Sequence, residues 1–219
     1  MPRRLFLLIS LTSSLFAQPA AQVFRLENTR GLKAVNVKLD AAEFSGRKAV
    51  HAQAEANRNG MAVMAFRFHS GTIELDVAGQ PAPGADSSAR GFIGLAFRVS
   101  GDETHYECFY LRPTNGRAED PIRRSHAVQY EAEPDYPWDR LRKENPGQYE
   151  SAADIQPGVW TKMKIVVEGR KAQLFVNGSE QPCLIVNDLK HGVTDGGLAL
   201  WVGPGTDGYF SNLRVTGAR

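Results

Sequence analysis

The sequence predicts an all-β fold in which two antiparallel sheets form a jelly-roll sandwich of the concanavalin A-like kind. Short stretches of alternating apolar and polar residues recur along the 219 residues, and glycine, proline, asparagine or aspartate stands between them. Only Ala41–Phe44 and Asp139–Glu144 read as helices, and both are short. Parallel βαβ units need long helices between their strands, so this spacing favours a sandwich.

The first 21 residues predict an export signal. Arg3 and Arg4 precede an apolar run that begins at Leu5, and small alanines follow it. Serines and a threonine interrupt the run, which is shorter than the roughly 20 residues that span a bilayer. We expect residues 1–21 to be a signal peptide and residues 22–219 to form one monomeric domain, secreted or periplasmic and without a membrane span.

The strands can be placed from the alternation and the turn residues. In chain order we expect strands at Val35–Leu39, Lys48–Ala52, Met61–Phe68, Thr72–Val77, Gly91–Val99, His105–Arg112, His126–Glu131, Trp160–Glu168, Lys171–Val176, Cys183–Val186, Leu198–Val202 and Tyr209–Val215. The segment Gln80–Ala89 is expected to be an exposed loop between two strands rather than a linker, because neither side alone has a complete set of strands.

One hairpin is indicated most strongly. Trp160–Glu168 alternates, Gly169-Arg170 turns the chain, and Lys171–Val176 returns it to the turn dipeptide Asn177-Gly178. Asn177-Gly178-Ser179 also matches a glycosylation sequon, but turn chemistry already explains the asparagine and the glycine. We therefore expect the two strands to be adjacent and antiparallel.

Alternation also assigns side chains to faces. In the strand that begins at Thr72, the inward set is Ile73, Leu75 and Val77, and the outward set is Thr72, Glu74 and Asp76. In Gly91–Val99, the inward set is Ile93, Leu95, Phe97 and Val99, and the outward set is Phe92, Gly94, Ala96 and Arg98. In His105–Arg112, one set is Glu107, Phe109 and Leu111, and the other is Tyr106, Cys108, Tyr110 and Arg112. Outward faces of this composition could hold a sugar or could simply be solvated.

The most unusual stretch is Tyr110–Tyr149. Between Leu111 and Glu144 it carries six arginines and one lysine against seven carboxylates, with tyrosines and a tryptophan interleaved. Arginine presents a planar fork of donors that suits carboxylates and sugar hydroxyls, and aromatic rings offer flat apolar faces. The alternative is an ion-paired surface loop stiffened by prolines.

A sugar site built on these features has a defined set of expected residues. The expected substrate-binding residues are Glu74, Arg98, Tyr110, Arg112, Asn115, Arg117, Tyr136, Trp138 and Trp201. Glu107 and His126 are the candidate acid or base if the protein is an enzyme, although a lone histidine in a loop is more often only solvated.

Other function classes are disfavoured. The formal charge of +2 falls to zero once Arg3 and Arg4 leave with the signal peptide, and each basic cluster has acids beside it, so no nucleic-acid partner is expected. No metal spacing, phosphate-binding loop or nucleophile elbow is present in the sequence, and no cofactor is expected. A structural calcium at Asp195-Gly196-Gly197 or Asp207-Gly208 stays open, because Asp-Gly is first of all a turn.

Two cysteines, Cys108 and Cys183, could form a disulfide in an exported chain. Both sit in strand-like runs where a small apolar residue fits the packing, and a sandwich of this size does not need a covalent link. We expect them to be unpaired.

The hairpin Trp160–Gly178, together with Gly197–Gly203 and Tyr209–Val215, resembles the concanavalin A-like lectin and glucanase superfamily, which includes laminin-G-like domains. The run Tyr110–Arg117 and the loop after it resemble, more narrowly, bacterial domains grouped with 3-keto-disaccharide hydrolases. The resemblance covers about the C-terminal 60% of the chain. It implies a jelly roll with a carbohydrate on the concave sheet.

The sequence departs from the enzymes of that superfamily. It lacks the Asn-Gly and Gly-Trp opening that the hydrolase domains often carry. β-Glucan hydrolases of the superfamily carry three acids in a Glu-x-Asp-x-x-Glu pattern, whereas here Glu74 and Asp76 supply two and Gly79 stands at the third position. We therefore favour carbohydrate binding, keep hydrolysis of a 3-keto-disaccharide or related glycoside as the alternative, and leave a structural or adhesive role as the third possibility.

Overall fold

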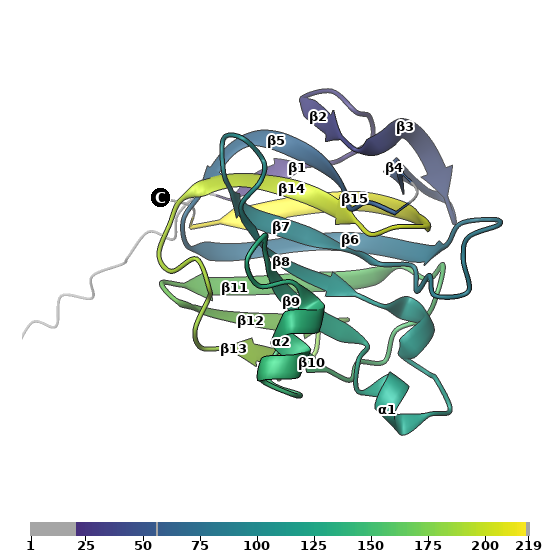
Figure 1. Cartoon of the computed structure of the whole chain (residues 1–219). Helices are drawn as coiled ribbons and strands as arrows, with labels where there is room; N and C mark the ends of the chain where they lie inside the picture. The colour runs from purple at the N-terminus through teal and green to yellow at the C-terminus, as the bar shows by residue number, and fades with distance from the viewer. Residues whose placement is uncertain (1–20, 56, 218–219) are drawn as a thin grey trace, which may run out of the picture.

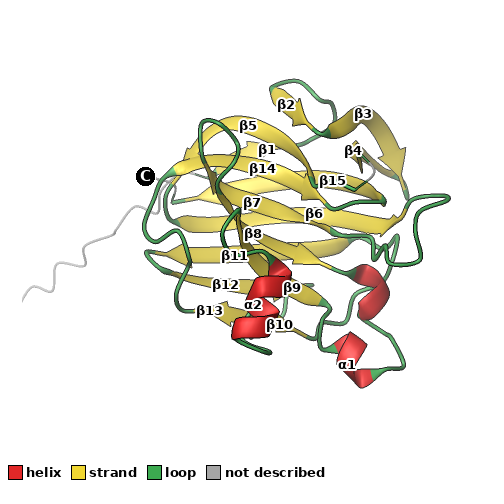
Figure 2. Ribbon diagram, viewed as in Figure 1, coloured by secondary structure: helices red, strands yellow, loops and turns green. Residues whose placement is uncertain are grey.

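The computed structural model describes residues 21–55 and 57–217, so the expected signal peptide lies outside the described residues except for residue 21. The described chain forms two stacked antiparallel sheets (Figures 1 and 2), which confirms the predicted sandwich. No helix within the described residues is long and apolar enough to cross a membrane.

The larger sheet has eight strands, ordered β13-β12-β11-β6-β15-β4-β3 with β1 paired to β15. Its strands are β1 (Gln22–Phe24), β3 (Val37–Phe44), β4 (Arg47–Ala54), β6 (Gly71–Pro81), β11 (Thr161–Glu168), β12 (Lys171–Val176), β13 (Leu184–Val186) and β15 (Thr206–Thr216). The expected hairpin is β11–β12, with Glu168 opposite Lys171, so that prediction is confirmed.

The second sheet has seven strands, ordered β10-β9-β8-β7-β14-β5-β2. They are β2 (Leu32–Val35), β5 (Gly60–Phe68), β7 (Ile93–Val99), β8 (Tyr106–Leu111), β9 (Val128–Glu133), β10 (Glu150–Ser151) and β14 (Gly196–Val202). Three short helices interrupt the chain between β8 and β10: η1 (Pro113–Asn115), α1 (Pro121–Arg124) and α2 (Trp138–Glu144). Helix α2 contains the predicted Asp139–Glu144.

The prediction of a second helix at Ala41–Phe44 is wrong. These residues end β3 and pair with β4, with Ala41 opposite Val50 and Phe44 opposite Arg47. Ser45 and Gly46 between the strands both have positive φ angles, +48° and +73°, as a tight hairpin turn requires. Phe44 also stacks on Tyr209 at 4.0 Å between ring centroids, so pairing and packing override a short helical pattern.

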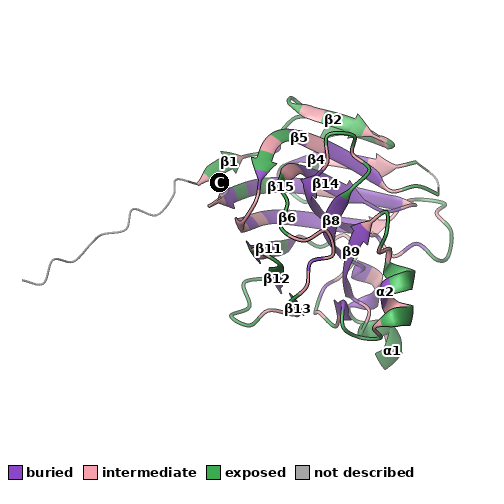
Figure 3. Ribbon diagram, turned by 60° about the vertical axis from the view of Figure 1, so that its left-hand side comes forward, coloured by how far each residue is buried: buried purple, intermediate pink, exposed green. Residues whose placement is uncertain are grey.

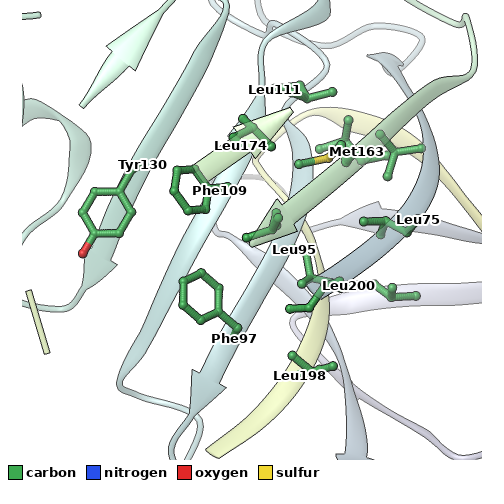
Figure 4. Close-up of a cluster of buried hydrophobic side chains, with 14 of the residues drawn as sticks. Leu75, Leu95, Phe97, Phe109, Leu111, Tyr130, Met163, Leu174, Leu198 and Leu200 are labelled. Atoms are coloured by element: carbon green, nitrogen blue, oxygen red, sulfur yellow. The ribbon is translucent and has the colours of Figure 1, made fainter. Parts of the chain in front are cut away.

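The main core lies between the sheets (Figure 4). Leu75 and Met163 from the larger sheet meet Leu95, Phe109 and Leu200 from the smaller one, and each of these five side chains is at most 1% exposed. Removing such side chains from water stabilises the fold by about 1.5–3 kcal/mol each. The alternation predicted for β6 is confirmed, because its inward set lies in this core.

A second apolar cluster lies on the outer face of the seven-stranded sheet, the face turned away from the other sheet. Its buried members are Met61, Ala96, Val99, Tyr106, Cys108, Tyr110, Ala199 and Trp201. In the ribbon of Figure 3, most residues of β8 and β9 are coloured as buried, beside the more exposed helix α2.

The prediction that Val99 belongs to the inward set is wrong because β7 contains a bulge. Arg98 has a φ of +53°, and the pairing with β14 steps from Val99 opposite Gly197 to Phe97 opposite Leu198. The extra residue breaks the period of two, so Val99 joins the outer cluster. The Arg98 side chain reaches the β11–β12 turn of the other sheet, donating to the carbonyl of Gly169 at 2.8 Å.

Candidate functional site

Two adjoining cavities lie on the outer face of the seven-stranded sheet. The first, of about 560 Å³, is lined by residues of β8, β9 and β14, by the loop 82–92 and by the start of α2. The second, of about 450 Å³, is lined mainly by the segment between β8 and β9, with α2 on one side. Ser88, Phe92 and Trp138 line both cavities, so together they form one groove.

The floor of the first cavity is an aromatic stack. Gly94 lies opposite Tyr110 on one side and Trp201 on the other, and a side chain there would come within 2.6 Å of the Tyr110 backbone. Because Gly94 has none, the rings of Tyr110 and Trp201 meet at 4.7 Å between centroids. Both residues are only 2% exposed, so they form the packed base of the cavity rather than an open aromatic face. The aromatic faces open to a ligand are those of Trp138, which is 42% exposed, and half-buried Phe92.

Glu131 is the chemically distinctive residue of the first cavity. The β9 alternation turns Tyr130 into the core and Glu131 and Glu133 toward the groove. Glu131 is 2% exposed, and its Oε1 has no hydrogen-bond partner. Burial, and then the charge of Glu133, raise the pKa of Glu131 to about 8, although the charge of Arg112 opposes the shift. The carboxyl is therefore mostly protonated at pH 7 and can donate a proton or a hydrogen bond.

Sequence reasoning missed Glu131. We counted it among the carboxylates of an ion-paired stretch, yet no cation within the described residues pairs with it at 4.0 Å or less. The signal was present in the sequence, because strict alternation from Val128 to Glu133 puts Tyr130 and Glu131 on opposite faces.

Arg112 lines the second cavity and bonds to Tyr110, which lines the first. Its Nη2 donates to the hydroxyl of Tyr110 at 3.0 Å and to Oε1 of Gln129 at 3.1 Å. Its Nη1 donates to the carbonyl of His126 at 3.2 Å and lies 3.6 Å from the Glu150 carboxylate. The residue is 5% exposed, so Arg112 both lines the groove and anchors its wall.

The second cavity is predominantly basic. Its lining cations are Arg90, Arg112, Arg123 and Arg142, and its lining carboxylate is Asp120. Arg142 forms a two-pronged pair with buried Glu150, with contacts of 2.6 to 3.1 Å. The guanidinium of Arg142 also lies over the Trp138 ring at 4.7 Å, which fixes that ring on the border between the cavities.

His126 and Asn115, both predicted, line the second cavity. Asn115 donates to the carbonyl of His126 at 3.1 Å and accepts from Arg123 at 2.9 Å. His126 Nε2 lies 3.3 Å from Glu150 Oε1. Burial lowers the pKa of His126, and the nearby arginines add to that effect while Glu150 opposes it. A neutral imidazole beside a carboxylate can accept a proton.

The other predicted residues do not line this groove. Glu74 lies on the outer face of the larger sheet, opposite Lys164 and Arg214 in register. Arg117 points outward and pairs with Asp154 at 2.6 Å. Tyr136 bridges back to β9 and packs against the core, with Arg140 over its ring at 4.6 Å.

Glu107 and Arg98 lie at one end of the space between the sheets. Glu107 is fully buried, and its carboxylate accepts from the hydroxyl of Tyr130 and from the backbone amide of His191 at 3.0 Å. Arg98 donates to three backbone carbonyls, those of His69, Gly169 and Gly192. Glu74, Glu107, Arg98 and Arg112 therefore do not converge, and of these four only Arg112 lines the groove.

The two aspartates considered for calcium have protein partners. The Asp207 carboxylate is 2.5 Å from His51 Nε2 and accepts from Gln80 at 3.1 Å, while Asp195 pairs with Arg67. In the part of the chain that the structure describes, no three or more histidine, cysteine or acidic side chains group to hold a metal ion. Cys108 and Cys183 are both free thiols.

The fold has many structural relatives. The carbohydrate binding module CBM66 from Bacillus subtilis matches with a TM-score of 0.58 at 15% identity, covering 84% of this chain and 95% of that one. A Bacillus subtilis protein of unknown function with a galectin-like fold matches with a TM-score of 0.60 at 11% identity, covering 91% and 97%. Peanut lectin matches with a TM-score of 0.56 at 8% identity, covering 91% and 97%.

These likenesses confirm the concanavalin A-like jelly roll, and at such identities they show the fold alone. No protein-family model matches the sequence, and no curated protein matches it significantly.

Proposed function

We propose that the protein is an exported carbohydrate-binding domain whose ligand lies in the groove on the outer face of the seven-stranded sheet. One observation carries the proposal: two adjoining cavities of about 560 and 450 Å³ share an aromatic border formed by exposed Trp138 and half-buried Phe92. Sites of this size with an apolar surface and a few convergent polar groups are typical of small-molecule recognition. Secretion and a monomeric state belong to the same proposal and rest on the sequence.

The groove offers the contacts that a sugar needs. Trp138 presents a ring face to the apolar side of a pyranose or furanose. Asn115 and Arg112 bring amide and guanidinium groups to the second cavity, and protonated Glu131 brings a hydroxyl donor to the first. Arg112 also bonds to neutral oxygens, so it positions the wall as well as offering donors.

The proposal is tested by blocking the groove. Ser88 is exposed and lines both cavities, whereas Ser87 is exposed and lines neither of those two. We expect wild type and Ser87→Trp to bind the same member of a glycan array with equal affinity, and Ser88→Trp to bind it at least about tenfold more weakly. Silence of the wild type across the array would contradict the proposal and favour a structural or adhesive role.

A second candidate function is hydrolysis of a 3-keto-disaccharide or a related glycoside, and Glu131 favours it. A carboxyl that stays protonated near neutral pH is what a general acid needs to protonate a leaving-group oxygen. Glu133, two residues along the same strand face, and His126 in the second cavity are the groups near the groove that could act as a base.

The two functions separate by turnover. A hydrolase releases monosaccharide from a 3-keto-disaccharide or an oligosaccharide panel, and Glu131→Gln removes that activity while Glu74→Gln, on the other sheet, keeps it. A binding domain leaves every member of the panel intact. Product formation that is the same for wild type and Glu131→Gln would contradict the role given to Glu131.

A further inference from the structure

The second cavity is lined by more arginines than carboxylates. Arg142 is paired with Glu150, which also lies near Arg112. Arg90 and Arg123 have no carboxylate within 4.0 Å among the described residues, and they bond only to neutral oxygens. Four arginines thus line the cavity, whose lining carboxylate is Asp120, with Glu150 paired to Arg142 and the charge of Asp86 acting on Arg90.

The four arginines line the same cavity, so their charges act on one another. Burial, and then the charges of Arg123 and Arg112, lower the pKa of the Arg90 guanidinium, while the charge of Asp86 opposes the shift. The Asp120 carboxylate accepts from the backbone amide of Ile122 at 2.9 Å, so it is held at the start of α1. A cluster of like charges around a cavity of about 450 Å³ is stabilised when an anion enters it.

The two cavities differ in charge along the groove. The first is lined by Glu131, Glu133 and Asp86, and the second by the arginines. A ligand that spans both meets a protonated carboxyl and acids at one end and guanidinium groups at the other. Such a groove suits a ligand with hydroxyl groups at one end and a negative group at the other, and it fixes the direction in which that ligand lies.

We propose that the second cavity is a subsite for the negative group of an acidic sugar, so that the preferred ligand is a glycan carrying a carboxylate or a sulfate. Guanidinium groups bind both kinds of anion in forked geometry. The inference rests on the proposed carbohydrate function and specifies its ligand class. Arg90 and Arg123 are the two residues whose donors are free of carboxylate partners and would contact the anion.

Matched pairs of oligosaccharides test the proposal. Oligogalacturonate and oligomannuronate are each compared by calorimetry with their carboxyl-reduced forms, and a sulfated carrageenan oligosaccharide is compared with its desulfated, neutral form. We expect the charged member of at least one pair to bind about tenfold or more tightly than its neutral form. The pair that shows the difference identifies the anion as a carboxylate or a sulfate.

Two variants tie the preference to the cavity. Arg90→Gln and Arg123→Gln should each lower the affinity for the charged ligand about tenfold while leaving that for its neutral form within about twofold. Arg214→Gln removes the same charge from the exposed face of the other sheet and should change neither. The neutral ligand also reports whether the variants are folded.

The outcomes separate this inference from the function on which it rests. Equal or tighter binding of the neutral members overturns the acidic subsite and leaves carbohydrate binding in place. Equal losses for charged and neutral ligands in the arginine variants likewise overturn it. Failure of every oligosaccharide and of a neutral glycan array to bind overturns both.

Discussion

Glu131 and Glu107 are both buried acids on neighbouring strands of the seven-stranded sheet. They lie on opposite faces of the sheet and differ in their hydrogen-bond partners. Glu107 faces the space between the sheets, where both carboxylate oxygens accept hydrogen bonds from Tyr130 and His191. Glu131 faces the groove, and its Oε1 has no partner. The pKa of each acid is raised, in both cases mainly by burial.

The two acids differ in whether the protein supplies their hydrogen-bond partners, and not in whether they are buried. Buried polar groups in folded proteins are almost always hydrogen-bonded, and an exception calls for an explanation. Glu107 needs none, because the protein supplies its partners. Glu131 lines a cavity of about 560 Å³, so a ligand can supply the partner that the fold does not.

The largest expected effect is on the pH dependence of stability. The Glu131 carboxyl has a pKa of about 8 when folded against a usual value of 4.5, so the folded state holds its proton while the unfolded state loses it. This stabilisation is complete below pH 4.5 and is lost as the pH rises through about 8, at up to about 1.4 kcal/mol per pH unit.

Glu131→Gln cannot titrate. Relative to wild type, its free energy of unfolding should therefore rise by a few kcal/mol from pH 5 to pH 8 and then stay level. Urea unfolding of both proteins across this range measures the difference. A difference that does not change with pH would show that Glu131 is not held protonated.

The next largest expected effect concerns Glu107, the buried acid whose carboxylate oxygens both accept hydrogen bonds. Glu107→Ala leaves the Tyr130 hydroxyl and the His191 amide without their acceptor in a closed interior, so we expect a loss of about 3 kcal/mol in unfolding free energy. Glu74→Ala, on the outer face of the other sheet, should cost less than about 0.5 kcal/mol. Equal urea midpoints for the two variants would contradict the prediction that Glu107 stabilises the fold more than Glu74 does.

Substitution of Arg112 tests whether this residue both stabilises the fold and binds the ligand in the groove. Arg112→Ala removes bonds to Tyr110 and Gln129 and a contact with Glu150, and should cost about 2 kcal/mol of stability. It should also abolish measurable glycan binding. Arg124→Ala, an exposed residue that bonds to the carbonyls of Ala118 and Glu119, should change neither quantity appreciably.

Both quantities are needed for Arg112, measured as melting temperature and as affinity per folded molecule. A destabilised variant whose folded fraction binds with wild-type affinity would mean that Arg112 is only scaffold. We expect instead that both quantities fall.

The smallest effect is at the rim of the groove. Trp138 is 42% exposed and lies on α2, so Trp138→Ala should weaken glycan binding by about 1 kcal/mol, roughly fivefold, with little effect on the melting temperature. Ile185→Ala removes a similarly exposed apolar side chain, 47%, from β13 of the other sheet and should leave the affinity unchanged. Equal glycan affinities for the two variants would show that the ligand does not contact Trp138 on α2.

Much of the fold followed from local pattern, and part of the groove did as well. Tyr110 and Arg112 were predicted from their shared strand face, and Trp138 from its place in the arginine-rich stretch. Arg98 was predicted on the outward face, and this prediction is wrong because its orientation depends on a bulge set by pairing with Gly197, about a hundred residues along the chain. Glu131 was missed because balanced charge in sequence was interpreted as pairing in space.

The central claim is that the groove, and not the outer face of the larger sheet, binds the ligand, and the three tryptophans offer a direct test. Trp138 and Trp201 line the first cavity, while Trp160 contacts Phe44 of the larger sheet. Titration of ¹⁵N-labelled protein with the tightest-binding glycan reports each indole N–H signal separately. If the groove binds the glycan, the Trp138 and Trp201 signals shift together with increasing glycan while that of Trp160 stays fixed; a shift confined to Trp160 would contradict binding in the groove.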